Sequence, residues 1–158
     1  MRRFPSGKYG RQTLHFHPAP FQAPLRAFAG LVFPWRNEEV LLCDIAGRGW
    51  CIPSGRVEWD EESLAAVRRE ALEEAGALLN NLQYIGCYQI IDKMETRWAD
   101  CYTSGVEELV EIQIREESFG RRFFKMEELP EHYHIWNELT NQVFQHAFEV
   151  YQRQMNRF

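Results

Sequence analysis

The sequence predicts a single α/β domain in which helices cover both faces of a mixed β-sheet. Apolar segments of strand length stand before and after one amphipathic stretch, and a second amphipathic stretch follows them. The resulting order is strands, helix, strands, helix. The length of 158 residues suits one domain with its own hydrophobic core. Hydrophobic residues make up 45% of the chain and charged residues 26%, which is typical of a globular protein.

Residues 1–24 are expected to form an irregular arm, which leaves residues 25–158 as the domain. Proline opposes helices and central strands. Four prolines fall in this short segment, at Pro5, Pro18, Pro20 and Pro24. Aromatic side chains in the same segment favour an arm that packs on the domain or on a partner subunit. A homodimer that exchanges its arms is therefore worth testing.

Two strands are expected before the first helix. Leu25–Phe33 is almost wholly apolar and is predicted to be a buried strand that ends at Pro34. A turn over residues 35–38 leads to the returning strand, Glu39–Ile45. A loop and a short extended run, Trp50–Ile52, then follow.

The first helix is expected to begin between Asp60 and Ser63 and to end at Gly76. Asp60 and Ser63 are both suitable N-cap residues, and acidic residues at 60–62 suit the positive end of the helix dipole. Gly76 suits the left-handed conformation that often closes a helix.

Three more strands and a last helix are expected after Gly76. The predicted strands are Leu82–Ile91, Trp98–Ile114 with an irregularity near Ser104–Gly105, and Arg121–Lys125, with a loop over residues 115–120. Apolar residues spaced by three and four then predict an amphipathic helix over Trp136–Tyr151.

Three glutamates gather on one face of the first predicted helix. At about 100° per residue, Glu70, Glu73 and Glu74 project within roughly a third of its circumference. Like charges at this spacing repel one another. The face is either a solvated acidic surface or a platform for a hard divalent cation, which prefers carboxylate oxygens.

The residues around these glutamates resemble the Nudix box. Its charged and glycine positions are matched by Gly55, Glu61, Arg69–Glu70, Glu73–Glu74 and Gly76. Ala71 and Ala77 depart from the larger aliphatic residues of the family. The chain is thus similar to the Nudix hydrolases, in their compact, MutT-like form. This resemblance implies an α/β/α sandwich from about residue 25 onward.

The resemblance also implies a reaction and a cofactor. Nudix hydrolases cleave a nucleoside diphosphate linked to another moiety, by attack of water on phosphorus. A nucleoside triphosphate or a nucleotide sugar is the expected kind of substrate. Mg²⁺ is the expected cofactor, with Mn²⁺ able to take its place. The carboxylates of Glu70, Glu73 and Glu74 and the carbonyl of Ser54 resemble its ligands, and Arg69 resembles the arginine that holds the glutamates.

The general base has three candidates. MutT-like enzymes carry a glutamate on a late loop before an aromatic strand, and Glu117 matches this arrangement. Glu116 is the neighbouring choice. In other members a glutamate of the box is the base, which here is Glu70.

Substrate contacts are less well marked in the sequence. Arg48 is the cation nearest to the end of the second predicted strand, where MutT-like proteins often hold phosphates. Asn137, at the start of the last helix, stands where some of them contact a purine edge. Asparagine at this position is also a common helix cap.

Charge and composition argue against several other classes of protein. A net charge of -5 argues against a nucleic-acid polymer as partner, although a metal can offset the charge of a small nucleotide. No apolar run is long enough to span a membrane. Four cysteines without a C-x-x-C pair are expected to be reduced and buried, and the protein to be cytoplasmic. The alternative function is a Nudix-like module that binds a nucleotide for regulation without hydrolysing it.

Overall fold

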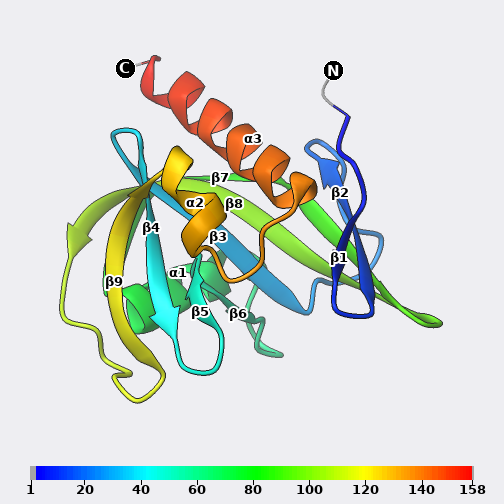
Figure 1. Cartoon of the computed structure of the whole chain (residues 1–158), viewed down its shortest axis with the longest axis horizontal. Coiled ribbons are helices and arrows are strands. Elements are labelled where there is room, and N and C mark those ends of the chain that lie inside the picture. Colours follow the sequence, from blue (N-terminus) through cyan, green and yellow to red (C-terminus); the bar gives the residue numbers. More distant parts are fainter. Residues whose placement is uncertain (1–2, 158) are drawn as a thin grey trace.

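The computed structural model describes residues 3–157, which form one nine-stranded sheet with helices on both faces (Figure 1). The strands are β1 (Gly7–Tyr9), β2 (Gln12–Pro18), β3 (Ala29–Arg36), β4 (Glu39–Ile45), β5 (Gly49–Cys51), β6 (Ser54–Arg56), β7 (Ala77–Asp92), β8 (Glu95–Leu109) and β9 (Ser118–Lys125). The helices are α1 (Ser63–Ala75), the 3-10 turn Met126–Glu128, α2 (Leu129–His132) and α3 (Glu138–Met155). No helix among the described residues is long and apolar enough to cross a membrane.

The sheet is mixed, as predicted. Its main path runs β1-β2-β7-β8-β3-β4-β5, with β6 paired to β3 and β9 paired to β4. The pairing of β3 with β8 is parallel and the other pairings are antiparallel.

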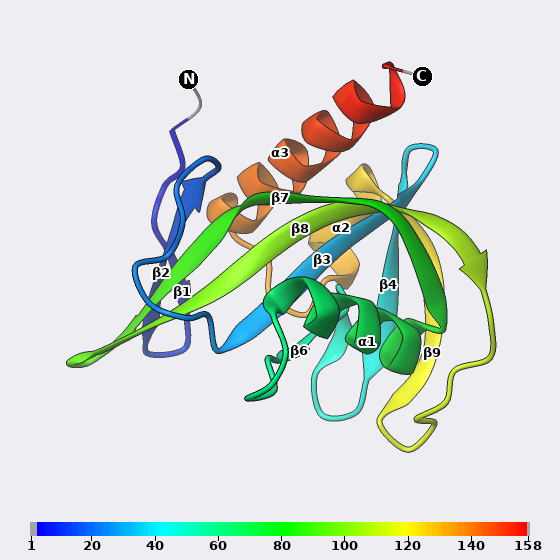
Figure 2. The ribbon, with the colours of Figure 1, turned by 180° about the vertical axis from the view of Figure 1, so that it is seen from behind.

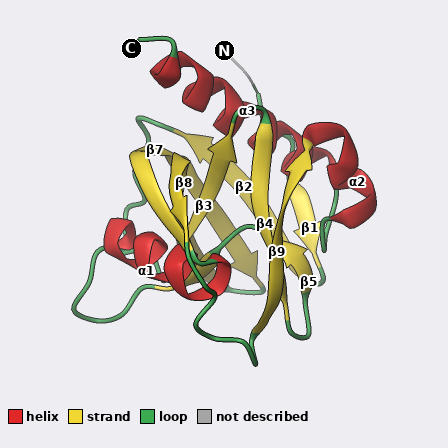
Figure 3. Cartoon of the chain, turned by 90° about the vertical axis from the view of Figure 1, so that its left-hand side faces the viewer, coloured by secondary structure: helices red, strands yellow, loops and turns green. Residues whose placement is uncertain are grey.

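The two long helices cover opposite faces of this sheet (Figures 2 and 3). On α1, Val67, Ala71 and Ala75 pack into one buried apolar cluster. The apolar side of α3 packs into a second, larger cluster, through residues that include Leu139 and Phe144. Each helix therefore buries one apolar stripe against its own face of the sheet.

The prediction of an irregular arm over residues 1–24 is wrong for two segments. Residues 7–9 form β1 and residues 12–18 form β2, which pairs with β7. The prolines do not prevent this, because Pro5 precedes β1 and Pro18 is the last residue of β2. Phe16 is buried in the core cluster beneath α3. The segment thus packs on its own chain.

The first long strand also differs from its prediction. β3 begins at Ala29 rather than Leu25 and continues through Pro34 to Arg36. Pro34 faces Ser104 of β8, but neither β4 nor β6 pairs with β3 at this position. A missing N–H is tolerated there because only one side of the strand is in a ladder.

The later elements differ from their predicted bounds. β7 begins earlier than predicted, directly after Gly76. β8 is displaced toward the N-terminus and runs from residue 95 to residue 109, so that residues 110–114 are not part of a strand. The irregularity expected near Gly105 of β8 lies across the ladder on β7, where the register shifts between Asn80 and Gln83. β9 begins at Ser118, inside the expected loop, and α3 extends to Met155.

The observed ends of α1 differ from the prediction at the N-terminus and agree with it at the C-terminus. Neither Asp60 nor Ser63 is its N-cap, since Glu62 occupies that position without a side-chain hydrogen bond. The Ser63 hydroxyl instead bonds to Asp100 and Tyr102. Gly76 closes the helix in the left-handed conformation, as predicted (φ 60°).

Candidate functional site

The acidic face of α1 is fixed against the short strand β6. Glu74 is only 9% exposed, and its Oε1 accepts a hydrogen bond from the Ser54 N–H at 3.0 Å. Beside it, the Glu70 carboxyl lies against Gly55, where any side chain on residue 55 would collide with it. This close approach is the physical reason for a glycine at the start of the box.

Arg69 holds several of these groups together. Its guanidinium donates to Glu61 at 2.7 Å, to Glu70 at 2.8 Å and to Glu73 at 3.4 Å. It also donates to the Arg56 carbonyl oxygen at 3.0 Å, which joins the helix to the end of β6. Hydrogen bonding to Glu61 is the main reason that the pKa of Arg69 is raised. Arg69 therefore contacts three glutamates through charge-assisted hydrogen bonds from one guanidinium.

Burial controls the charge of the two inner glutamates. Desolvation raises the pKa of Glu74 to about 8, against the lowering effect of the Ser54 N–H, and the charge of Glu70 adds to the rise. The pKa of Glu70 is raised in the same way, first by burial and further by the charges of Glu73 and Glu117. Two buried carboxyls side by side favour a positive partner.

Glu117 lies close enough to act on Glu70 electrostatically. Its own backbone carbonyl accepts from the Ala46 N–H at 2.8 Å. The next residue, Ser118, donates its hydroxyl hydrogen to the Glu74 carbonyl oxygen at 2.6 Å, which ties the start of β9 to the end of α1. Both Glu116 and Glu117 have exposed side chains.

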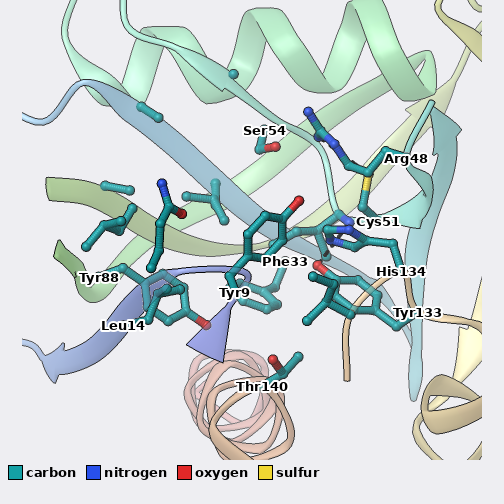
Figure 4. A pocket seen from close by; sticks show the side chains of 18 of the residues that line it. Tyr9, Leu14, Phe33, Arg48, Cys51, Ser54, Tyr88, Tyr133, His134 and Thr140 are labelled. Atoms are coloured by element: carbon teal, nitrogen blue, oxygen red, sulfur yellow. Dashed lines mark hydrogen bonds between the residues drawn. The ribbon is translucent and has the colours of Figure 1, made fainter. Parts of the chain in front are cut away.

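A largely apolar cavity of about 380 Å³ lies beside Ser54 (Figure 4). Ser54 and Gly55, which contact the glutamates from one side, form part of its lining. In Figure 4, Ser54 and Arg48 lie on the side toward α1, and Thr140 lies on the side toward α3. The acidic site and the cavity thus share one segment of backbone.

The two residues predicted to contact the substrate, Arg48 and Asn137, differ in their placement. Arg48 lines the cavity and is near enough to Glu74 to lower its pKa. Asn137 does not line the cavity. It is the N-cap of α3, with its side-chain oxygen accepting from the Thr140 N–H at 2.9 Å, and its amide nitrogen donates to the Lys8 carbonyl at 3.3 Å. This geometry favours the capping interpretation over contact with a purine.

Several cavity residues were not singled out by the sequence. Tyr9 and Gln12 come from the β1–β2 hairpin, and Tyr133 and His134 from the segment after α2. Burial lowers the pKa of His134 to about 4, and the charge of Arg48 lowers it further. The alternation of Gln12, Leu14 and Phe16 was the one local signal of an amphipathic strand in this region.

The carboxyl groups as placed are held by protein donors. Among the described residues, no three His, Cys, Asp or Glu side chains gather in an arrangement that could hold a metal ion. The donor set nevertheless suits a hard cation, because Glu70, Glu73 and Glu74 offer oxygens beside the Ser54 backbone.

Comparison with known proteins identifies the class to which this fold and site belong. The NUDIX domain family matches residues 24–145. The chain belongs to this family, and the prediction drawn from the spacing of the box residues is confirmed.

Individual relatives agree with this assignment. A Bacillus subtilis (strain 168) protein that carries the provisional name 8-oxo-dGTP diphosphatase YtkD is 34% identical over 91 residues, which are 58% of this chain. The match spans 56% of the length of that relative.

Solved structures confirm the α/β sandwich. The Bacillus subtilis pyrophosphohydrolase BsRppH superposes with a TM-score of 0.75 at 22% identity, over 95% of this chain and 97% of the other. A MutT NUDIX hydrolase from Burkholderia pseudomallei superposes with a TM-score of 0.62 at 20% identity, over 77% and 98%.

Proposed function

We propose that the protein is a Mg²⁺-dependent hydrolase of small nucleotides. The substrate would be a nucleoside diphosphate linked to another moiety, and water would attack phosphorus. The observation that carries this proposal is the shared segment Ser54–Gly55, which borders both the acidic face of α1 and the 380 Å³ cavity. A nucleotide whose base enters the cavity can extend its phosphates toward the glutamates. The cavity has a volume typical of small-ligand sites.

Four groups would hold the metal. These are the carboxylates of Glu70, Glu73 and Glu74 and the carbonyl oxygen of Ser54, and Mn²⁺ could take the place of Mg²⁺. Bound there, the cation would screen the phosphates, stabilise charge on the leaving oxygen and lower the pKa of a water molecule. Arg69 would keep the glutamates in position through Glu61 and the Arg56 carbonyl.

Glu117 is the proposed general base. It is exposed, so it is able to reach a water molecule, and its charge acts on Glu70 within the acidic site. A base in this role contributes roughly 10²- to 10⁴-fold to the rate. Glu117→Gln should therefore lower kcat by about this factor. If Glu116→Gln or Glu70→Gln has the larger effect on a metal-saturated enzyme, the base is that residue instead.

Nucleoside triphosphates are the first substrates to test, with nucleotide sugars second. The name of the Bacillus subtilis relative specifies an 8-oxo-dGTP diphosphatase. Arg48 would contact the phosphates, since it lines the cavity beside Glu74 and carries the positive charge that they require.

The test is a nucleotide panel with Mg²⁺, with the products separated by chromatography. Some member of the panel should yield a nucleoside monophosphate, and Glu74→Gln should abolish this without lowering the thermal midpoint of unfolding. Glu62→Gln is the matched control, because Glu62 is exposed at the start of the same helix and contacts none of the site. Stabilisation by nucleotides without any turnover would overturn the proposal and favour a regulatory module.

Two expectations from the sequence are retained as proposals. All four cysteines are free and buried, which agrees with their predicted state and is typical of a reducing cytoplasm. A homodimer is also retained, although the β1–β2 segment packs against its own chain. Light scattering of the purified protein would decide the oligomeric state.

A further inference from the structure

The β1–β2 hairpin forms a wall of the cavity and lies outside the part of the chain that matches the NUDIX domain. Its residues Tyr9, Gln12 and Leu14 line the cavity, whereas the family match begins at residue 24. Residues outside the family match can set a substrate preference that the NUDIX domain does not itself fix.

Tyr9 and Gln12 are neighbours in the lining of the cavity. They are directly opposed across the β1–β2 ladder, so their side chains project from the same face of the hairpin. The two-residue turn between them contains Gly10, whose φ of 61° is in the left-handed region that favours glycine. In Figure 4 the Tyr9 side chain extends from β1 toward the side on which Ser54 lies.

The hairpin is held in place at both ends. Gly7 packs so closely on α3 that an added Cβ would lie 2.9 Å from Leu139, and Asn137 donates to the Lys8 carbonyl. At the turn, Arg11 pairs with Asp92 of β7 at 3.2 Å. A wall fixed in this way can position a side chain for recognition.

The Gln12 amide is free to bind a ligand. Within residues 3–157 no hydrogen bond engages it, although it is only partly exposed. Two other polar groups of the cavity already have a protein partner, because the Thr140 hydroxyl donates to Asn137 and the Tyr133 hydroxyl accepts from the Ile52 N–H. Gln12 therefore offers a donor and an acceptor side by side in a mainly apolar space.

Aromatic rings beside Gln12 suit a flat heterocycle. Tyr9 is 40% exposed, and its ring lies edge-on to the His134 ring with 6.0 Å between centroids. Tyr88 and Phe33 also line the cavity. Such surfaces accept the faces of a nucleobase, while one amide can contact its edge.

We propose that Gln12, supported by Tyr9, selects the nucleobase of the substrate. This proposal rests on the proposed function, in which the substrate is a nucleotide. The amide matches an edge on which a donor stands next to an acceptor, such as N6–H and N7 of adenine. Guanine presents two acceptors, O6 and N7, and the amide can satisfy only one of them. In 8-oxoguanine N7 carries a hydrogen, which restores a donor beside the O6 acceptor.

The experiment compares kcat/KM for ATP, GTP and 8-oxo-GTP in the wild type and in Gln12→Ala. The wild type should favour ATP and 8-oxo-GTP over GTP. Gln12→Ala should lose about tenfold or more on the two favoured substrates, mainly through KM, and change little on GTP. Tyr9→Phe should keep the preference because it keeps the ring, whereas Tyr9→Ala should weaken binding of all three nucleotides.

Thr13→Ala is the matched control. Thr13 follows Gln12 on β2 and projects from the opposite face, where its hydroxyl accepts from the Lys8 ammonium at 2.7 Å. Its kcat/KM values should equal those of the wild type. Equal thermal midpoints for all variants would exclude loss of the hairpin as the cause of an effect.

The outcomes separate the two proposals. If the wild type hydrolyses nucleotides but Gln12→Ala lowers all three rates equally, or none of them, the role of Gln12 is refuted. If the wild type hydrolyses nothing, the proposed function fails. Calorimetric titration with ATP and GTP then still tests Gln12, because the alanine variant should bind ATP more weakly and GTP unchanged. Unchanged binding of ATP would refute its role.

Discussion

Gly55 and Glu70 are packed so closely that a methyl group on Gly55 would collide with the Glu70 carboxyl group. The contact places β6 directly against the acidic face of α1. It also makes the glycine a requirement of the site rather than of the local backbone, because Gly55 is not among the residues with a positive φ.

Gly55→Ala should therefore damage activity more than stability. The added methyl group would displace the Glu70 carboxyl by an ångström or more, and a misplacement of this size lowers kcat by about 100-fold. Gly120→Ala is the control, because nothing lies within 4 Å of its added Cβ. Steady-state kinetics and thermal unfolding of both variants would check this. Equal kcat for Gly55→Ala and the wild type would contradict the placement of Glu70.

Arg69→Lys should weaken the acidic site although the charge is retained. One ammonium group cannot reach Glu61, Glu70 and the Arg56 carbonyl together, as the guanidinium does. We expect kcat/KM to fall by about tenfold and the thermal midpoint to fall by about 2–4 °C. Arg115→Lys, in an exposed pair with Glu111, should change neither value. A wild-type kcat/KM in Arg69→Lys would remove its positioning role.

The metal-free protein should lose stability as the pH rises from the ordinary pKa of Glu74 toward its raised value. The folded state holds the proton of Glu74 up to a pKa of about 8, whereas the unfolded state releases it near 4.5. Between these values the folded state binds more protons, so the free energy of unfolding falls with rising pH. The limit is about 1.4 kcal/mol for each unit by which the pKa is raised.

Thermal unfolding in the presence of a chelator would measure this slope. Glu74→Gln should remove the part of the slope that comes from Glu74, because its amide does not titrate. His134 has the opposite effect on the pH dependence of stability. Its pKa is lowered in the folded state, so the free energy of unfolding falls as the pH drops below the ordinary pKa of histidine. Because the wild type and Glu74→Gln both contain His134, the difference between their stabilities at each pH cancels the contribution of His134. Identical slopes would show that Glu74 is ionised in the folded protein.

The acidic site could be predicted from the sequence because its parts lie close together along the chain. Glu70, Glu73 and Glu74 occupy one helix, and helical periodicity alone places them on one face. The C-cap at Gly76 was predicted because a glycine follows the periodic stretch and suits the left-handed conformation. The sequence did not predict two partners of Arg69, the Glu61 carboxylate and the Arg56 carbonyl, because these contacts depend on how the loop returns to the helix.

The cavity could not be predicted because its walls come from distant segments. Gln12 and His134 both line it, and no local pattern relates the strand of the first to the segment of the second. The strand β2 itself was missed because its partner β7 lies about 70 residues away and its prolines suggested an irregular arm. The proposed recognition of the base by Gln12 would depend on such contacts between distant parts of the chain.

Asn137 connects α3 with the β1–β2 hairpin, and two substitutions can distinguish the effects of its two hydrogen bonds. Its side-chain oxygen caps α3 at Thr140, and its amide nitrogen holds the hairpin through the Lys8 carbonyl. Asn137→Ala loses both contacts and should lower the stability of the protein by about 1 kcal/mol. Asn137→Asp keeps an oxygen that can cap the helix but has no donor for Lys8.

Asn137→Asp should therefore recover most of the stability while KM stays raised. The cap accounts for the stability of the helix, whereas the lost donor loosens the hairpin that carries Tyr9 and Gln12. Thermal unfolding gives the first quantity, and steady-state kinetics with the best nucleotide gives the second. If KM returns to the wild-type value in Asn137→Asp, the link between α3 and the hairpin does not support the cavity wall. If neither variant changes KM, Asn137 acts only as a helix cap.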